Sequence, residues 1–373
     1  MKHVASALVL LSASATAAGA LGLDRSGQDI SAIFEPGGFA KLSYGFTRQD
    51  LSGYDISGDP MTDAADDFSE ADLAVKTDLG GSFSLGLIID EPYGSDIAYG
   101  GDPQTTFLGG TRFGIDSRAI TAIGRYRFND SLSVHGGLQR VTLDGVVAFS
   151  GRGFGPLQGY RVDLEDGEGT AWLAGIAYER PENRLRIALT YNSGTEIDAA
   201  TTEIFADGEF RSRTKFTLPE AWNLDVQTGI GPNTLVFGSI RSAAYSQTQL
   251  MPAGLEIGLA DLNLADITSI TDMDDGRAYE LGVSRQFTET FEGLVALTFE
   301  PRAGDDFVSA LTPVNGLAGL TIGGTYTLNS VELSGTIRYT VFGDARPTVV
   351  GLPVGALTSN EALSVGLSVA YRF

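Results

Sequence analysis

The last eleven residues of the chain, 363–373, alternate strictly between apolar side chains and small or polar ones. The apolar positions are the odd-numbered ones: Leu363, Val365, Leu367, Val369, Tyr371 and Phe373. A transmembrane β-strand needs about 9–11 residues and points alternate side chains at lipid and at the lumen. The pattern predicts a β-barrel of the outer membrane of a Gram-negative bacterium, and we expect the barrel-assembly machinery to recognise the terminal Phe373.

The N-terminus has the pattern of a secretory signal peptide. Lys2 starts a mostly apolar run that continues to Leu11, and residues 15–17 form an A-x-A cleavage site. We expect residues 1–17 to be removed, so that the mature chain begins at Ala18. The run is too short to be a membrane anchor, because a spanning helix needs about 18 apolar residues.

The rest of the chain predicts strands that are joined alternately by long polar stretches and by tight turns such as Gly80-Gly81 and Asn129-Asp130. The expected strands are 39–48, 69–78, 83–90, 117–128, 132–143, 170–179, 185–192, 221–229, 234–245, 278–286, 291–300, 318–328, 331–342 and 363–373. About fourteen strands, an even number, can close without a free edge. Bacterial barrels place short turns in the periplasm and long loops outside. The fold class is therefore an all-β, antiparallel transmembrane barrel over 39–373; a soluble β-sandwich or propeller would not show this alternation of connections.

The segment 18–38 precedes the first strand and carries no periodic face. Pro36 would break a helix that continued through it. The alternation of connections places the segment at the periplasmic mouth, where it either hangs free or folds inward as a plug.

Four stretches carry a resemblance to a known family. Residues 33–38 (IFEPGG) resemble an F-x-N-P-A-G segment before the first strand, with Glu35 at the Asn position and Gly37 at the Ala position. Residues 85–94 are similar to an L-G-(V/L)…P-(F/Y)-G pattern, 123–133 to a hairpin, and 218–222 to L-P-(E/D)-x-(W/F) at the start of the eighth strand. In this order they resemble the FadL family of outer-membrane transporters for long-chain fatty acids and aromatic hydrocarbons.

The resemblance implies a barrel of fourteen strands with an N-terminal hatch, here 18–38, inside it. It implies that the third strand is kinked inward at Pro92 and Gly94, which opens a lateral gap, and that two long loops form the first groove for a hydrophobic ligand. The ligand-binding residues that we predict from this resemblance and from their apolar character are Leu21, Leu23, Ile33, Phe34, Pro36, Phe39, Phe149, Phe154, Leu157, Phe205 and Phe210.

The long connections contain apolar residues that a water-filled porin would not need at its mouth. The third connection, 144–169, and the fourth, 193–220, hold most of them: Val146, Val147, Phe149, Phe154, Leu157, Ile204, Phe205, Phe210 and Phe216. An exposed apolar cluster usually marks a binding surface. The alternative is that the two connections pack against each other as a cap, and both arrangements can hold together.

Charge and composition narrow the chemistry. The formal charge of −22, which becomes −23 when Lys2 leaves, disfavours a nucleic-acid partner, and acidic outer loops suit contacts with lipopolysaccharide through divalent cations. The chain has no cysteine, and His135 is the only histidine beyond the signal peptide. His135 shares the lumen face of its predicted strand, where a hydrogen-bonded filler is more common than a catalyst. We therefore expect no enzyme activity and no cofactor.

Two groups of charged residues are candidate sites. Asp272, Asp274 and Asp275 match only part of a calcium loop and predict a solvated acidic loop instead of a metal site. Arg125 and Arg127 face the lumen but are too few to form the constriction ring of a porin for sugars or ions. The sequence thus predicts a passive transporter for hydrophobic small molecules. The alternatives are a general diffusion porin and a structural or adhesive barrel.

Overall fold

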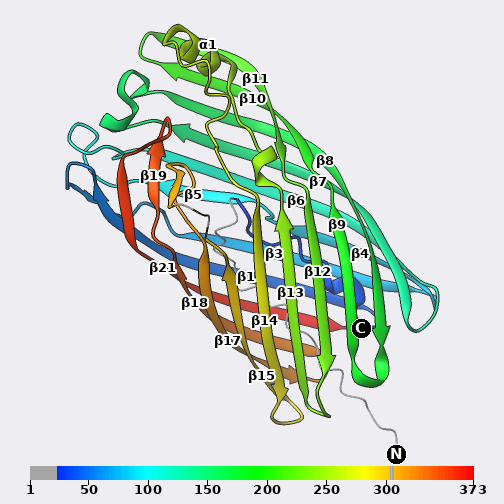
Figure 1. Ribbon diagram of the computed structural model, residues 1–373. Coiled ribbons are helices and arrows are strands. Elements are labelled where there is room, and N and C mark those ends of the chain that lie inside the picture. The colour runs from blue at the N-terminus through cyan, green and yellow to red at the C-terminus, as the bar shows by residue number, and fades with distance from the viewer. Residues whose placement is uncertain (1–22, 303, 305) are drawn as a thin grey trace, which may run out of the picture.

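The alternating segments of the sequence form the strands of one closed antiparallel barrel (Figure 1). The computed structural model describes residues 23–302, 304 and 306–373, so the predicted signal peptide and Leu21 lie outside the described residues. Fourteen spans make the ring. In order they are β1 (Phe39–Asp55), β3 (Phe68–Leu79), β4 (Phe83–Asp90), β6 (Arg112–Arg127), β7 (Leu132–Ala148), β8 (Arg161–Arg180), β9 (Leu185–Asn192) continued by β10 (Thr195–Phe205), β11 (Gly208–Leu218) continued into β12 (Ala221–Gly229), β13 (Thr234–Ala243), β14 (Gly276–Gln286), β15 (Phe291–Glu300), β17 (Leu317–Leu328), β18 (Val331–Phe342) and β21 (Gly355–Arg372).

The first and last spans pair with each other and close the ring. β1 pairs with β21 from Phe39↔Arg372 to Asp55↔Gly355, and β1 pairs with β3 on its other side. Closure leaves no free edge at the first or the last span of the sheet, as a lipid environment requires. The predicted fold class and the number of strands are confirmed.

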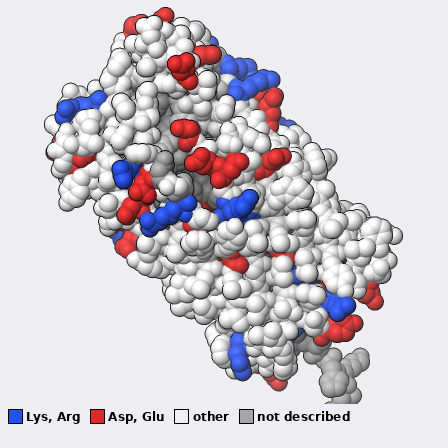
Figure 2. All heavy atoms as spheres, in the orientation of Figure 1, with Lys and Arg blue, Asp and Glu red and all other residues white. Residues whose placement is uncertain are grey.

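Apolar side chains of the strands are exposed on the outside of the barrel and polar ones are buried inside, as in a membrane barrel. The odd-numbered residues of 363–373 are 41–64% exposed, whereas Ser364 is fully buried. Aromatic pairs mark the turn end of the barrel, among them Tyr126 with Phe128 and Tyr371 with Phe373. In Figure 2 few charged side chains interrupt the belt between the two charged ends of the molecule. These are the features of a barrel that spans a bilayer.

Shorter elements lie between the spans. They are β2 (Pro60–Met61), β5 (Gly94–Ala98), β16 (Phe307–Ser309), β19 (Arg346–Val349), β20 (Leu352–Pro353), the single turns of helix η1 (Ser31–Phe34), η2 (Arg152–Leu157), η3 (Pro181–Asn183) and η4 (Tyr245–Gln247), and α1 (Ala253–Asp261). Among the described residues, no helix combines the length and the apolar character needed to cross a membrane. Figure 1 shows α1 beside the tips of β10 and β11, at the end of the barrel away from the tight turns.

The prediction that 144–169 and 193–220 are loops is wrong for much of their length. β7 runs on to Ala148, β8 begins at Arg161, and β10 pairs with β11 from Thr195↔Leu218 to Phe205↔Gly208. The outward side chains of β11 above the membrane belt are charged and exposed, as at Arg211, Arg213 and Lys215. No lipid faces this part of the wall, so the apolar alternation that identified the other strands is missing.

Candidate functional site

Aromatic residues from the third and fourth long connections pack against one another over the lumen. The rings of Phe149 and Phe154 stack with centroids 4.5 Å apart. Tyr160 joins the two connections, because its ring lies 5.3 Å from Phe149 and 5.1 Å from Phe205. These four residues belong to or border one apolar cluster at the extracellular end of the barrel, which we call the cap cluster. The two connections therefore form a cap, one of the two arrangements that the sequence left open.

The remaining predicted residues of these connections lie at the margin of the cap cluster. Leu157 packs half-buried against it. Phe210, at the tip of the β10–β11 hairpin, is 39% exposed. Its ring contacts α1 closely, because a Cβ atom on Gly254 would come within 2.9 Å of it. The structure thus brings Phe149, Phe154 and Phe205 together and leaves Phe210 at the outer surface.

A buried carboxylate, which no sequence pattern indicates, joins the cap to α1. The carboxylate oxygens of Glu203 accept hydrogen bonds at 2.7 Å from the backbone N–H groups of Gly254 and Leu255. Tyr160 donates its hydroxyl to the same carboxylate at 2.8 Å. Burial, together with the charge of Glu203, raises the pKa of Tyr160 above its ordinary value, so its hydroxyl remains a donor. A negative group at a helix N-terminus is also favoured by the helix dipole.

The N-terminal segment, residues 23–38, is held on one side of the lumen by Arg241 of β13. Nε and Nη2 of Arg241 donate to the carboxylate of Asp24 at 2.5 and 2.7 Å. Nη1 donates to the side chains of Gln28 at 3.2 Å and Asn223 at 2.9 Å. Arg241 and Asp24 are both buried. The pair joins residues 217 positions apart, so no local sequence pattern could have indicated it.

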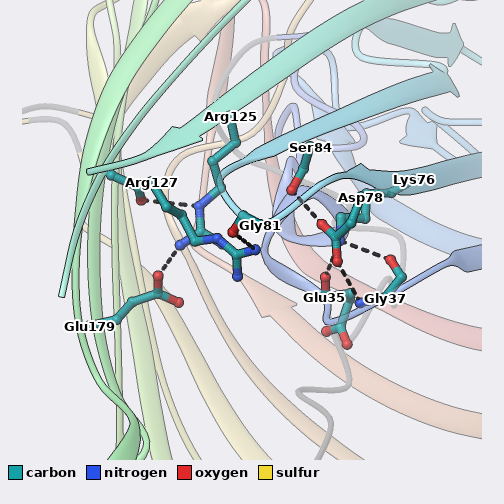
Figure 3. Close-up of polar contacts among 10 residues, drawn as sticks. Glu35, Gly37, Lys76, Asp78, Gly81, Ser84, Arg125, Arg127 and Glu179 are labelled. Carbon is teal, nitrogen blue, oxygen red and sulfur yellow. Dashed lines mark hydrogen bonds and ion pairs between the residues drawn. The ribbon is translucent and has the colours of Figure 1, made fainter. Parts of the chain in front are cut away.

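Lys76 of β3 holds the other end of the segment (Figure 3). Its Nζ donates to the backbone carbonyls of Glu35 at 2.6 Å and of Gly37 at 2.9 Å. Asp78 accepts a hydrogen bond from the backbone N–H of Gly37 at 2.9 Å, and Ser84 donates its hydroxyl to the same carboxylate. The segment is thus anchored to the wall at both ends.

Phe34 lies among the polar side chains of the turn end. The guanidinium groups of Arg125 and Arg186 each lie 4.7 Å from the centre of its ring. His135 meets the same ring edge-on at 5.5 Å, and its Nε2 shares a hydrogen bond with Thr190 Oγ1 at 2.9 Å. Arg125 also pairs with Glu179 (Figure 3). The inward direction predicted for Arg125 and His135 agrees with their burial.

The other predicted residues of the segment are arranged in three ways. Leu23 is buried within the cap cluster. Ile33 packs with Ile88 and Ile123 against the wall, and Phe39 packs near Ala370. Pro36 is exposed.

The strand pairing of the barrel wall is interrupted next to the segment, and we call this interruption the side window. β3 pairs with β4 only as far as Leu73↔Ile89, and in the described pairing residues 68–72 have partners on the β1 side alone. The segment that would pair with residues 68–72 on the other side leaves the sheet between β4 and β5. Pro92 and Gly94, where the resemblance implies a kink, lie at this break. Above the window, the chain just before β3 meets β5 again, because Asp66 donates its N–H to the carbonyl of Asp96 at 2.7 Å.

Arg25 fills the window from the inside. Its guanidinium lies 3.5 Å from the centre of the Phe68 ring on one edge and forms an ion pair with Asp96 on the other. A Cβ atom on Gly94 would come within 2.7 Å of Arg25 Nε, so a larger residue there would make the Arg25 side chain shift. The backbone of Arg25 donates to the carbonyl of Pro92 at 3.0 Å. The sequence offered no signal for Arg25, because its ion-pair partner Asp96 lies 71 positions further along the chain.

Beneath the segment lies a charged cavity of about 310 Å³. Carboxylates outnumber cations among its lining residues: the acidic ones are Asp29, Glu35, Glu70, Asp72, Asp90, Asp225, Glu280, Glu300 and Glu332, and the basic ones are Arg25, Lys41, Arg186, Arg241 and Arg338. Apolar side chains such as Ile30, Ile88 and Phe237 lie between the charged groups, so the lining is mixed.

The acidic outer loop has no arrangement suited to a metal. Asp275 accepts a hydrogen bond at 3.0 Å from the backbone N–H of Ser246. Across the described residues, no group of three or more acidic or histidine side chains could hold a metal ion.

The similarity of this protein to known proteins is seen in their three-dimensional structures. No protein-family model and no curated protein matches the sequence. A FadL homologue from Pseudomonas aeruginosa superposes with a TM-score of 0.73 at 12% identity, over 95% of this chain and 96% of that chain. The toluene transporter TodX of Pseudomonas putida gives a TM-score of 0.63 at 12% identity, over 92% of both chains. The toluene transporter TbuX of Ralstonia pickettii gives 0.62 at 10% identity, over 92% and 91%. The protein therefore has the fold of the FadL-type outer-membrane barrels, as the four sequence stretches implied.

Proposed function

We propose that this protein is a passive outer-membrane transporter that takes hydrophobic small molecules through the barrel wall. The observation that carries the proposal is the continuity of the cap cluster with the side window. Phe68 and Tyr93 at the window and Leu23 behind it belong to the same apolar cluster as Phe149 and Phe154. An apolar ligand that displaces these packed side chains stays in apolar surroundings from the cap to the window.

The charged cavity argues for lateral release. A hydrophobic ligand that continued towards the periplasm would have to displace water from carboxylates such as Asp225 and Glu280. Release through the window places it in the acyl chains of the bilayer, where its apolar surface stays out of water. The solved toluene transporters with this fold support the same ligand class.

The N-terminal segment acts as the hatch in this proposal. Its anchors at Arg241 and Lys76 keep it across the lumen, and Arg25 closes the window. Ligand that displaces Leu23 from the cap cluster pulls on Asp24 and Arg25, which are next in the chain. No energy source is needed, because the ligand moves down its own gradient.

The proposed partners follow from the surface. The exposed apolar belt faces lipid, and the acidic outer loops contact lipopolysaccharide through divalent cations. Phe373 is exposed at the end of β21 and serves as the signal for the barrel-assembly machinery.

The test compares uptake with conductance. Cells of a host that lacks its own hydrophobic transporter should accumulate labelled toluene faster with this protein than with an empty vector. The purified protein should conduct almost no current in a planar bilayer. Uptake at the empty-vector level together with a large, steady conductance would identify a diffusion porin instead.

The window itself is tested by two lipid-facing tryptophans. Ala71→Trp places a bulky ring at the window edge and should lower toluene uptake several-fold. Ala122→Trp, on the intact wall of β6, is the matched control and should leave uptake unchanged. If both variants transport as well as the wild type, the ligand does not leave through the window.

A further inference from the structure

Apolar and hydrogen-bonding side chains meet at the inner edge of the side window. Phe68, Glu70 and Asp72 follow one another on the inward face of β3, in the stretch that has partners on the β1 side alone. Phe68 belongs to the cap cluster, whereas Glu70 and Asp72 line the charged cavity. A ligand that moves from the cap cluster to the window therefore passes Glu70.

Glu70 has an acceptor oxygen that the protein does not use. The residue is 4% exposed, and none of the described residues donates a hydrogen bond to its Oε2. The nearby cation Arg25 is engaged in its ion pair with Asp96. Buried oxygens of Asp72 and Asp90 in the same cavity likewise lack a described donor. A buried polar atom without a partner costs free energy, which a donor on a ligand recovers.

A hydroxyl group on a ligand supplies such a donor. A carboxyl group keeps an acceptor oxygen whether or not it is protonated, so this contact does not depend on the charge of Glu70. A ring beside Phe68 has Glu70 within reach, because two residues of a strand span about 7 Å. The cavity that Glu70 lines, about 310 Å³, has the size of a small ligand pocket, for which the range is about 300–1,000 Å³.

We infer that the inner edge of the side window binds hydrophobic molecules that carry a hydroxyl group, such as phenols and fatty alcohols, and that Glu70 accepts the hydrogen bond of that hydroxyl. The inference rests on the proposed transport function and names a substrate class of the same path. Glu70 is its specificity-determining residue, because a ligand without a donor leaves the buried oxygen unpartnered.

p-Cresol and its methyl ether test the inference, because they share the ring and the oxygen and only p-cresol can donate a hydrogen bond. Both dissociation constants are measured by equilibrium dialysis with the purified protein in detergent, after subtraction of binding to protein-free micelles. The preference for p-cresol, taken as the ratio of the two constants, should fall about fivefold in Glu70→Leu, which has no acceptor. An unchanged ratio would show that Glu70 meets only solvent and would overturn the inference.

Two further variants assign the effect to Glu70. Glu70→Gln keeps a side-chain carbonyl oxygen and should retain the wild-type preference. Glu292→Leu is the matched control and should also retain it, because Glu292 Oε1 is buried without a described donor but lies at the turn end of β15, outside the cavity lining. Both leucine variants remove an unpartnered buried carboxyl group, so we expect both to fold.

The remaining outcomes separate this inference from the transport function. A loss of preference in Glu70→Gln or in Glu292→Leu as large as that in Glu70→Leu would overturn the inference, since the hydroxyl would not be recognised by the acceptor at the window. Toluene uptake by the same protein would leave the transport function intact. If neither compound binds and toluene uptake stays at the empty-vector level, the transport function and the inference are both refuted.

Discussion

At the scale of single residues, Arg241 is the strongest attachment of the N-terminal segment to the wall. Arg241→Met keeps the length of the side chain but leaves Asp24 buried without its partner. Breaking a buried ion pair costs about 3–5 kcal/mol. We expect the segment to detach and the conductance in planar bilayers to rise from almost none to discrete open events.

The control for this variant is an exposed pair. Arg211→Met removes the partner of Glu209 at the β10–β11 tip, where both side chains are solvent-exposed and the pair contributes about 0–1 kcal/mol. Conductance should stay at the wild-type level. If the conductance of Arg241→Met is as low as that of Arg211→Met, the Asp24 contact does not hold the segment.

Arg25 is a second single residue with a testable role, because its side chain spans the window from Phe68 to Asp96. Arg25→Ala removes that closure without a change in the strands. Toluene uptake should increase several-fold, and Arg25→Lys, which keeps a charge near Asp96, should increase it less. A lower rate in Arg25→Ala would mean that Arg25 helps the ligand through instead of closing the window.

At the scale of elements, Glu203 joins β10 to α1 and so determines whether the cap stays closed. Gln at this position can accept through only one oxygen, so one of the two N–H groups at Gly254 and Leu255 loses its partner, at a cost of about 1–3 kcal/mol. Glu203→Gln should make limited proteolysis within 253–270 several-fold faster. Glu209→Gln, at the exposed tip, should leave the cleavage rate unchanged, and equal rates in the two variants would refute the role of Glu203.

The elements also show which parts of the fold a sequence can reveal. Residues 83–90 and 291–300 were predicted as strands with the bounds of β4 and β15, because lipid on one side enforces strict alternation. Above the membrane belt that constraint ends, and the sequence predicts loops where the structure has β10 and β11. The weakened pairing at Pro92 and Gly94 could be predicted from backbone chemistry, whereas the inward kink there was implied only by the family resemblance. The ion pairs of Asp24 and Arg25 could not, because only the closed barrel brings their partners near.

At the scale of the whole molecule, the acidic composition has a consequence inside the barrel as well as outside. The wall of the charged cavity retains more carboxylates than cations when the N-terminal segment is removed. A charged lining selects ions of the opposite sign. Deletion of residues 18–38 should therefore open a conductance that prefers cations, seen as a cation-directed reversal potential in a KCl gradient. The preference should weaken in about 1 M salt, where charges are screened within about 3 Å. A deletion variant that conducts anions equally well would show that the wall charges do not face the open path, and one that conducts no more than the wild type would show that the segment does not close the lumen.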